Sequence, residues 1–168
     1  MYKRQDGGTG DTDVPRTVVV SPDGDSVVIT GNSWGEGTGS DYLTAVYDTA
    51  TGEKRWSARY DGSGHGLDVA YSAAFAPSGD HVVVTGRSAE AETGEDFATV
   101  AYDATSGEQV WSALYDAGGS GDVANAVAVT EGPGSQTRIV VTGQSNIMLD
   151  EMTSDADMAT LSYLVELG

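Results

Sequence analysis

Aspartate and glycine recur in two short segments whose pattern could bind a hard cation. The segments are "DGGTGDTD" at 6–13 and "DGSGHGLD" at 61–68. Calcium takes about six to eight oxygen ligands, which clustered carboxylates and loop carbonyls supply. Neither segment matches an EF-hand loop, and the alternative is that glycine forms tight turns, aspartate caps them and the charge is solvated. With the corresponding acids farther along the chain, the candidate calcium ligands are Asp6, Asp11, Asp13, Asp61, Asp68, Asp116 and Asp122.

A second group of side chains suits the binding of a larger ligand. Trp34, in "NSWGEGTG", is expected in a loop, where it could stack on a sugar ring or a partner side chain, or pack over its own loop. The ligand-binding candidates are Trp34, Glu36, Arg87 and Glu92. His65 and His81 are expected on the surface at opposite ends of one strand, so they predict no shared metal site. No Ser-His-Asp or paired-carboxylate arrangement can be identified, and we therefore assign no catalytic and no cofactor-binding residue.

The composition excludes several classes of protein. The chain has 26 acidic and 8 basic residues, for a net charge of −18, so its surface repels nucleic acid and anionic lipid. It has no cysteine, which excludes disulfides and thiolate metal sites. No apolar run approaches the roughly 18 residues of a spanning helix, and no signal peptide is visible. The first five residues, "MYKRQ", share nothing with the rest and are interpreted as a non-native leader.

The chain repeats itself with a period near 55 residues. The segment "TGEKRWSARYDG" at 51–62 returns as "SGEQVWSALYDA" at 106–117. The strand-like "VVITG", "VVVTG" and "IVVTG" end at Gly31, Gly86 and Gly143. Self-similarity at such a period is typical of repeat architectures. We place the three units at 6–61, 62–116 and 117–168.

Each unit divides into extended segments separated by turn signals such as "SPDG" and "TATG". The first two units have four such segments, and the third lacks its fourth. The middle segments are apolar without alternation, which indicates that both of their faces are covered. A two-sheet sandwich would show clean alternation, whereas a β-propeller packs each four-stranded sheet, or blade, between two others. The predicted fold is therefore all-β, an arc of three antiparallel blades from a propeller of six to eight.

The long loops are those that join consecutive blades and those that join the second strand of a blade to the third. Both should emerge on one side of such an arc. That side is expected to hold most of the acids, including Asp41 and Asp96 in the loops between second and third strands, with Arg87 as its only firm cation. An acidic face of this kind attracts cations and cationic ligands.

Two motifs carry a family resemblance. "VYDTATGEKRW" and "AYDATSGEQVW" resemble the repeat of pyrroloquinoline-quinone-type (PQQ-like) β-propellers, and "VVVTGRS" with the following Asp-x-x-Thr resembles the bacterial SBBP β-propeller repeat. The resemblance implies that Trp56 and Trp111 dock one blade on the next. It also implies a bacterial protein that is extracellular, at the cell surface or periplasmic. The residues expected to have structural roles are Trp56, Trp111, Tyr47, Tyr102, Tyr163, Gly31, Gly86 and Gly143.

Two functions remain open at this point. The first is a non-enzymatic scaffold or binding module that presents an acidic loop face to a protein, a glycan or a cation such as calcium. The alternative is a fragment of a PQQ-dependent dehydrogenase. The resemblance implies that such an enzyme needs a closed ring, a bound calcium and often a vicinal disulfide. The lack of cysteine favours the binding module. Because an open arc would expose unpaired strand edges, we also expect the chain to self-associate.

Overall fold

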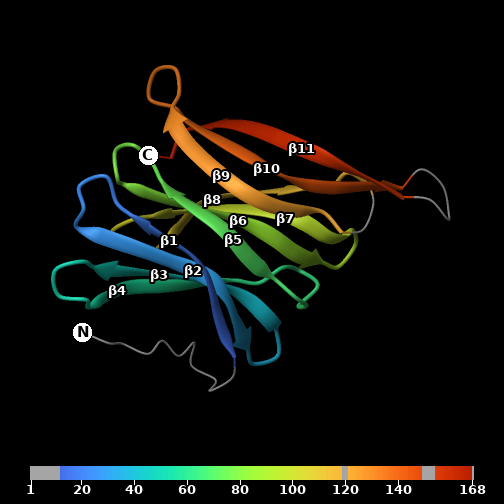
Figure 1. Ribbon diagram of the computed structural model, residues 1–168, viewed down its shortest axis with the longest axis horizontal. Helices are drawn as coiled ribbons and strands as arrows, with labels where there is room; N and C mark the ends of the chain where they lie inside the picture. The colour runs from blue at the N-terminus through green and yellow to red at the C-terminus, as the bar shows by residue number, and fades with distance from the viewer. Residues whose placement is uncertain (1–11, 119–120, 149–153, 168) are drawn as a thin grey trace.

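The computed structural model of the chain describes residues 12–118, 121–148 and 154–167, and in this part the structure is all-β (Figure 1). Eleven strands form three antiparallel sheets of four, four and three strands. The described part of the chain contains no helix that could span a membrane. Sheet 1 comprises β1 (Asp13–Val20), β2 (Ser26–Gly35), β3 (Gly39–Asp48) and β4 (Lys54–Tyr60); sheet 2 comprises β5 (Val69–Phe75), β6 (His81–Glu90), β7 (Gly94–Asp103) and β8 (Gln109–Tyr115); sheet 3 comprises β9 (Val123–Glu131), β10 (Thr137–Met148) and β11 (Ser154–Val165).

The predicted all-β class is confirmed, and within each sheet the strands follow one another in chain order. The expected unit boundaries at 61/62 and 116/117 fall between β4 and β5 and between β8 and β9. In the described residues the three sheets do not close into a ring. The predicted non-native leader lies outside the described residues.

Aspartate-capped turns set the pairing of the third and fourth strands. Asp48, the last residue of β3, accepts hydrogen bonds at Oδ1 from the backbone N–H groups of Ala50 (3.0 Å) and Thr51 (2.8 Å). Gly52 follows with a φ of 69°, a conformation that favours glycine. Asp103 makes the corresponding bonds at the end of β7. The two turns have the same length and the same hydrogen bonds, and β3–β4 and β7–β8 have matching registers.

A glycine is required where each first strand bends against its neighbour. The pairing shifts by a residue between Pro15 and Thr17 in sheet 1, a β-bulge beside Gly31. A Cβ atom on Gly31 would overlap the carbonyl oxygen of Val14, because the two backbones approach closely. Gly86 in β6 and Gly143 in β10 lie beside equivalent shifts and close approaches.

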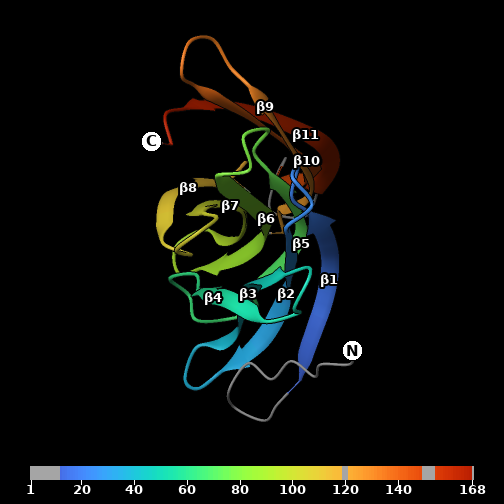
Figure 2. The same ribbon diagram turned by 90° about the vertical axis from the view of Figure 1, so that its left-hand side faces the viewer.

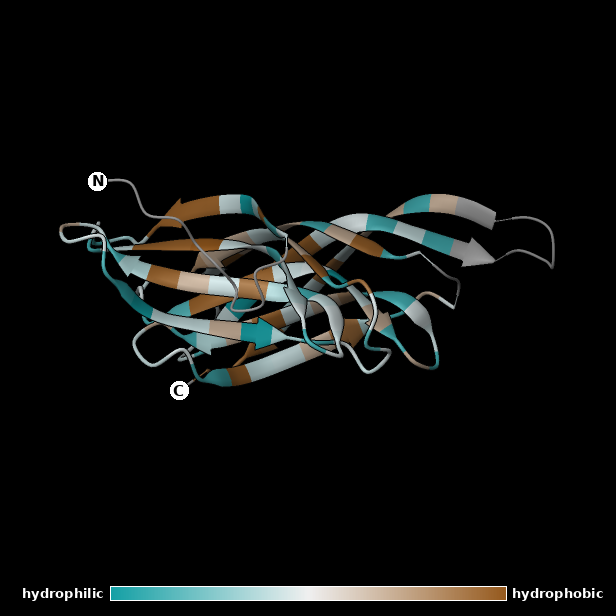
Figure 3. Ribbon diagram, turned by 90° about the horizontal axis from the view of Figure 1, so that it is seen from below, coloured by the Kyte–Doolittle hydropathy of each residue, from teal (hydrophilic) through white to brown (hydrophobic). Residues whose placement is uncertain are grey.

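The hydrophobic core consists of two clusters, one on each face of sheet 2. Alternate residues of β6 and β7 point in opposite directions, as strand geometry requires. Val82 and Val84 belong to the cluster shared with sheet 1, whereas Val83 belongs to the cluster shared with sheet 3. Sheet 2 therefore lies between the other two (Figures 1 and 2), which confirms for this sheet that both faces are covered. Figure 3 shows hydrophobic bands within the strands and paler or hydrophilic colours at many turns.

Aromatic residues join neighbouring sheets. Trp56 of β4 is 8% exposed, and its indole N–H donates at 2.8 Å to the carbonyl oxygen of Ala104, directly after β7 of sheet 2. Its ring lies 5.9 Å from that of Tyr102, which is itself buried. In the next sheet Trp111 is half-buried and meets Tyr163 of β11 edge-on at 5.2 Å. Tyr47, near the end of β3, is also half-buried.

Candidate metal centre

Two groups of three aspartates lie where one sheet passes to the next. We call Asp41, Asp61 and Asp68 the first triad, and Asp96, Asp116 and Asp122 the second triad. Within each triad the three carboxylates offer oxygen atoms that all lie within 4.8 Å of one another. The first member is the third residue of β3 or β7, the second directly follows β4 or β8, and the third directly precedes β5 or β9. Each triad therefore takes two aspartates from one sheet and one from the approach to the next.

Backbone hydrogen bonds bring the third aspartate to its partners. The segment before β5 runs beside the start of β3, where the N–H of Ser40 donates to the carbonyl oxygen of Gly66 at 3.0 Å. The N–H of Asp68 in turn donates to the carbonyl oxygen of Ser40 at 2.6 Å, next to Asp41. In the second triad the N–H of Asp122 donates to the carbonyl oxygen of Glu95 at 2.8 Å, which is the equivalent bond.

The carboxylate of Asp68 is fully buried and held by donors. Its Oδ1 accepts bonds from the Ser88 hydroxyl and the Ala89 N–H, both at 2.7 Å, and its Oδ2 accepts one from the Gly62 N–H at 3.1 Å. Burial raises the pKa of Asp68, while the hydrogen bond from Ser88 and those from the two backbone groups lower it.

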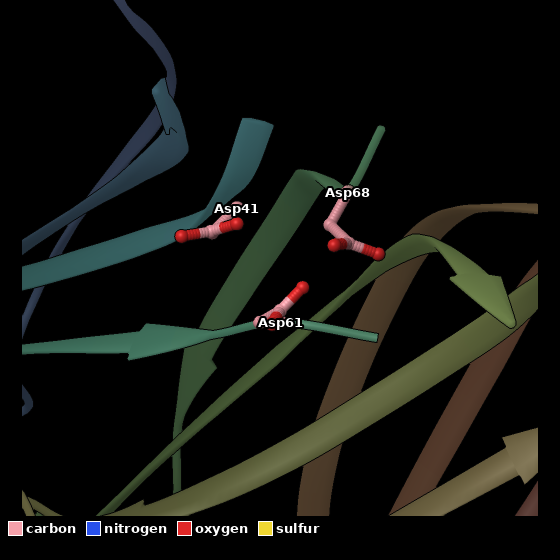
Figure 4. Close-up of side chains that lie close together, drawn as sticks. All are labelled: Asp41, Asp61 and Asp68. Atoms are coloured by element: carbon pink, nitrogen blue, oxygen red, sulfur yellow. The ribbon is translucent and has the colours of Figure 1, made fainter. Parts of the chain in front are cut away.

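The other two carboxylates of the first triad each keep a buried oxygen without a partner among the described residues. Asp41, 2% exposed, accepts at Oδ2 from the Thr38 hydroxyl (2.9 Å) and from Arg59 (3.0 Å), and its Oδ1 has no partner. Asp61 lies 2.6 Å from Nδ1 of His65 through Oδ2, and its Oδ1 has no partner. Figure 4 shows the three carboxylates converging from β3, the end of β4 and the start of β5. Buried oxygens of this kind lack the hydrogen bonds that normally offset desolvation.

The second triad has the same construction. Asp122 is fully buried and accepts from the N–H groups of Ala117 (2.9 Å) and Asn146 (2.8 Å). Asp96, 2% exposed, accepts at Oδ2 from the Thr93 hydroxyl, and its Oδ1 is buried with no partner in the described structure. Asp116 is exposed and accepts at Oδ1 from the N–H of Gly118 at 2.7 Å.

The electrostatics of the second triad favour a cation. Burial raises the pKa of Asp96, and the negative charges of Asp116, Glu90 and Asp122 raise it further, against a lowering by the Thr93 hydroxyl. Crowded carboxylates resist ionisation because each ionised group repels the next. A divalent ion among them would remove that repulsion.

The spacing also fits an ion of calcium size. Calcium lies about 2.3–2.6 Å from its oxygen ligands, so two ligands on opposite sides of it are about 4.6–5.2 Å apart. In both triads one oxygen from each carboxylate lies within 4.8 Å of the other two, which is inside this limit. Both triads could therefore hold a metal ion.

The structure brings some of the predicted calcium ligands together and separates others. Asp61 and Asp68 share the first triad, and Asp116 and Asp122 share the second. Asp13, at the start of β1, belongs to neither triad, and Asp6 and Asp11 lie outside the described residues.

Asp41 and Asp96 were expected only as members of an acidic loop face, and that expectation is wrong. Both are buried strand residues that complete the triads. In the sequence, these two aspartates stand at the same place in the repeat, as the first residues of "DYLTAVYD" and "DFATVAYD".

The ligand-binding candidates are spread over two hairpins. Trp34 was expected in a loop, but it lies in β2 because this strand pairs with β3 as far as Gly35 and Gly39; the side chain is 49% exposed. Glu36 is exposed in the turn that follows. Arg87 of β6 pairs with Glu95 at 2.8 Å, and Glu92 is exposed in the turn between β6 and β7.

Two further expectations are corrected. Arg87 is not the only cation near these acids, because Arg59 contacts Asp41. His81 is buried rather than on the surface, with Nδ1 2.8 Å from Asp80, whereas His65 is exposed as expected.

No family model, no curated protein and no solved structure matches the chain.

Proposed function

We propose that this chain is a non-enzymatic binding module of the β-propeller type in which divalent cations, calcium above all, bind between consecutive sheets. The observation that carries the proposal is the buried, unpartnered oxygen that each triad retains at equivalent positions, Asp41 in one and Asp96 in the other. A solvated acidic surface would expose these oxygens to water. A cation supplies the missing partner.

Calcium suits the donors better than the other common metals. All three side chains in each triad are carboxylates, which are hard oxygen ligands. Zinc favours nitrogen and sulfur, and magnesium demands a near-ideal octahedron at about 2.1 Å. Calcium tolerates irregular cages and completes its shell with carbonyls and water.

The bound ion would strengthen the junction between sheets. Because Asp41 and Asp61 come from sheet 1 and Asp68 from the approach to sheet 2, an ion shared by them links the two sheets. A ligand that binds the folded chain alone stabilises it by about 2.7 kcal/mol at about 100 times its Kd. The proposed role is therefore a rigid, ion-stiffened scaffold.

The propeller arrangement and the location are parts of the same proposal. The burial of both faces of sheet 2 by its neighbours supports consecutive blades. Calcium sites in extracellular modules work at about 0.1–1 mM, which agrees with the secreted or cell-surface setting that the family resemblance implies. The dehydrogenase alternative is favoured by no observation on the described residues.

Calorimetry tests the proposal. The chain is stripped with a chelator, dialysed into about 0.1 M potassium chloride and titrated with calcium chloride. We expect saturable binding and a higher Tm in calcium, and we expect Asp68→Asn together with Asp122→Asn to abolish both.

The matched control is Glu108→Gln, which removes a charge from an exposed residue just before β8, at the far end of that strand from Asp116. This variant should bind as the parent does. The absence of heat and of a Tm change at about 10 mM calcium would refute the proposal.

A further inference from the structure

The two triads differ at one position of the fourth strand of their sheet, which is β4 for the first triad and β8 for the second. Arg59 of β4 pairs with Leu43 of β3, and Leu114 of β8 pairs with Ala98 of β7 in the same register. The chain therefore places an arginine beside the first triad and a leucine at the equivalent place beside the second.

Arg59 is fixed next to the first triad. One of its terminal nitrogens donates to Oδ2 of Asp41 at 3.0 Å and to the carbonyl oxygen of Ser33 at 3.1 Å. The other donates to the Ser33 hydroxyl at 2.6 Å and to the carbonyl oxygen of Trp34 at 3.1 Å. Four acceptors hold the guanidinium in place, so it neutralises one of the three carboxylates permanently.

Arg59 is not the only nitrogen-bearing side chain at the first triad. Nδ1 of His65 lies 2.6 Å from Oδ2 of Asp61. Because Arg59 offsets one charge, the first triad has fewer uncompensated charges than its three aspartates suggest. The first triad still keeps two buried oxygens without partners in the described structure, those of Asp41 and Asp61. It therefore has oxygen atoms to offer a cation but less net negative charge to attract one.

Among the described residues, no arginine corresponds to Arg59 beside the second triad. Leu114 is uncharged and 50% exposed, and the sequence between Asp116 and Asp122 contains no basic residue. Arg87 in the adjoining strand β6 is paired with Glu95 at 2.8 Å. Glu90 does not distinguish the triads, because the Ser88 hydroxyl that contacts Asp68 of the first triad at 2.7 Å also contacts the Glu90 carboxylate at 2.9 Å. The buried Oδ1 of Asp96, 2% exposed as a residue and without a partner in the described structure, therefore points to a ligand that the protein does not provide.

We propose that the second triad is the high-affinity divalent-cation site of this protein, and that the residue at position 59 or 114 sets the affinity of each triad. The first triad is a weak site because Arg59 occupies one carboxylate and repels a second cation. This inference rests on the proposed function, that the triads bind divalent cations at all.

Exchange of the two residues tests the inference by calorimetry with calcium chloride. The parent chain should show two sites whose Kd values differ at least tenfold, and Asp122→Asn should remove the tighter one while Asp68→Asn leaves it. Leu114→Arg should weaken the tight site at least tenfold. Leu114→Gln, which is polar but uncharged, should leave it within about threefold of the parent.

The reverse exchange should tighten the first triad. Arg59→Leu should bring its Kd to within tenfold of the second, and Arg59→Gln, which keeps a donor for Ser33, should do so as well. Thermal melts check that each variant is folded. Leu114 is exposed and its replacement tests the inference even where a variant at Arg59 fails to fold.

The outcomes separate the two proposals. Two equal sites in the parent, or unchanged tight binding by Leu114→Arg, would overturn the inference and leave the proposed function intact. A parent chain that binds no calcium overturns the proposed function, and the inference with it.

Discussion

Truncation of Trp56 to alanine should lower the free energy of unfolding by about 3–5 kcal/mol. The side chain is 8% exposed and packs in the core between sheets 1 and 2, where its ring lies 5.9 Å from that of Tyr102. Its indole N–H also donates to the carbonyl oxygen of Ala104 at 2.8 Å, a bond that contributes about 1 kcal/mol. The cavity and the lost apolar burial account for the rest.

Urea unfolding followed by tyrosine and tryptophan fluorescence measures this loss. Trp111→Ala is the matched control, since Trp111 is half-buried and should cost about 1–3 kcal/mol. Trp56→Phe keeps most of the ring and should cost about 1–2 kcal/mol, which keeps the test usable if the alanine variant is unfolded in water. A loss below about 1 kcal/mol for Trp56→Ala would refute the view that this residue joins the two sheets.

Three further predictions concern turns, acid and salt. Gly107→Ala should destabilise more than Gly24→Ala, because both glycines have positive φ (75° and 83°) but a Cβ on Gly107 also collides with the Trp56 ring; equal midpoints in urea would contradict this. The ion pair and hydrogen bond from Arg55 and the bonds within the turn lower the pKa of Asp48 from 3.8 to about 2, so its stabilising contribution is present above pH 4 and is lost as the pH falls through 2. Asp48→Asn should therefore flatten the fall in Tm between pH 4 and 2, and an unchanged acid dependence would count against it. With a net charge of −18, the Tm should rise between 0.05 and 0.5 M potassium chloride, and a flat response would exclude significant repulsion among the carboxylates.

Local patterns were enough to predict the strands and most turns. The "SPDG" and "TATG" turns form their own hydrogen bonds, and the lack of alternation between apolar and polar residues in β6 and β7 reflects burial on both faces. The segment "NSWGEGTG" predicts a loop at Trp34, because it is rich in glycine and polar residues. In the structure β2 pairs with β3 as far as Gly35, which leaves only a short turn. That outcome depends on the partner strand and not on the segment itself.

The triads could be predicted only in part, because they are assembled by contacts distant in sequence. Asp61 and Asp68 share one glycine-rich segment, so their proximity was visible. Asp41 joins them through the backbone bonds between Ser40 and the segment before β5, which no local pattern encodes. The place of Arg59 beside Asp41 likewise follows from the register of β4 on β3.

The most direct test of the account is a crystal structure of the full chain grown from about 1 mM calcium, with anomalous data to identify the ion. The proposed calcium binding predicts a strong peak within about 2.3–2.6 Å of carboxylate oxygens from Asp96, Asp116 and Asp122. Carboxylates that remain close together with water alone among them, and no anomalous peak, would contradict it.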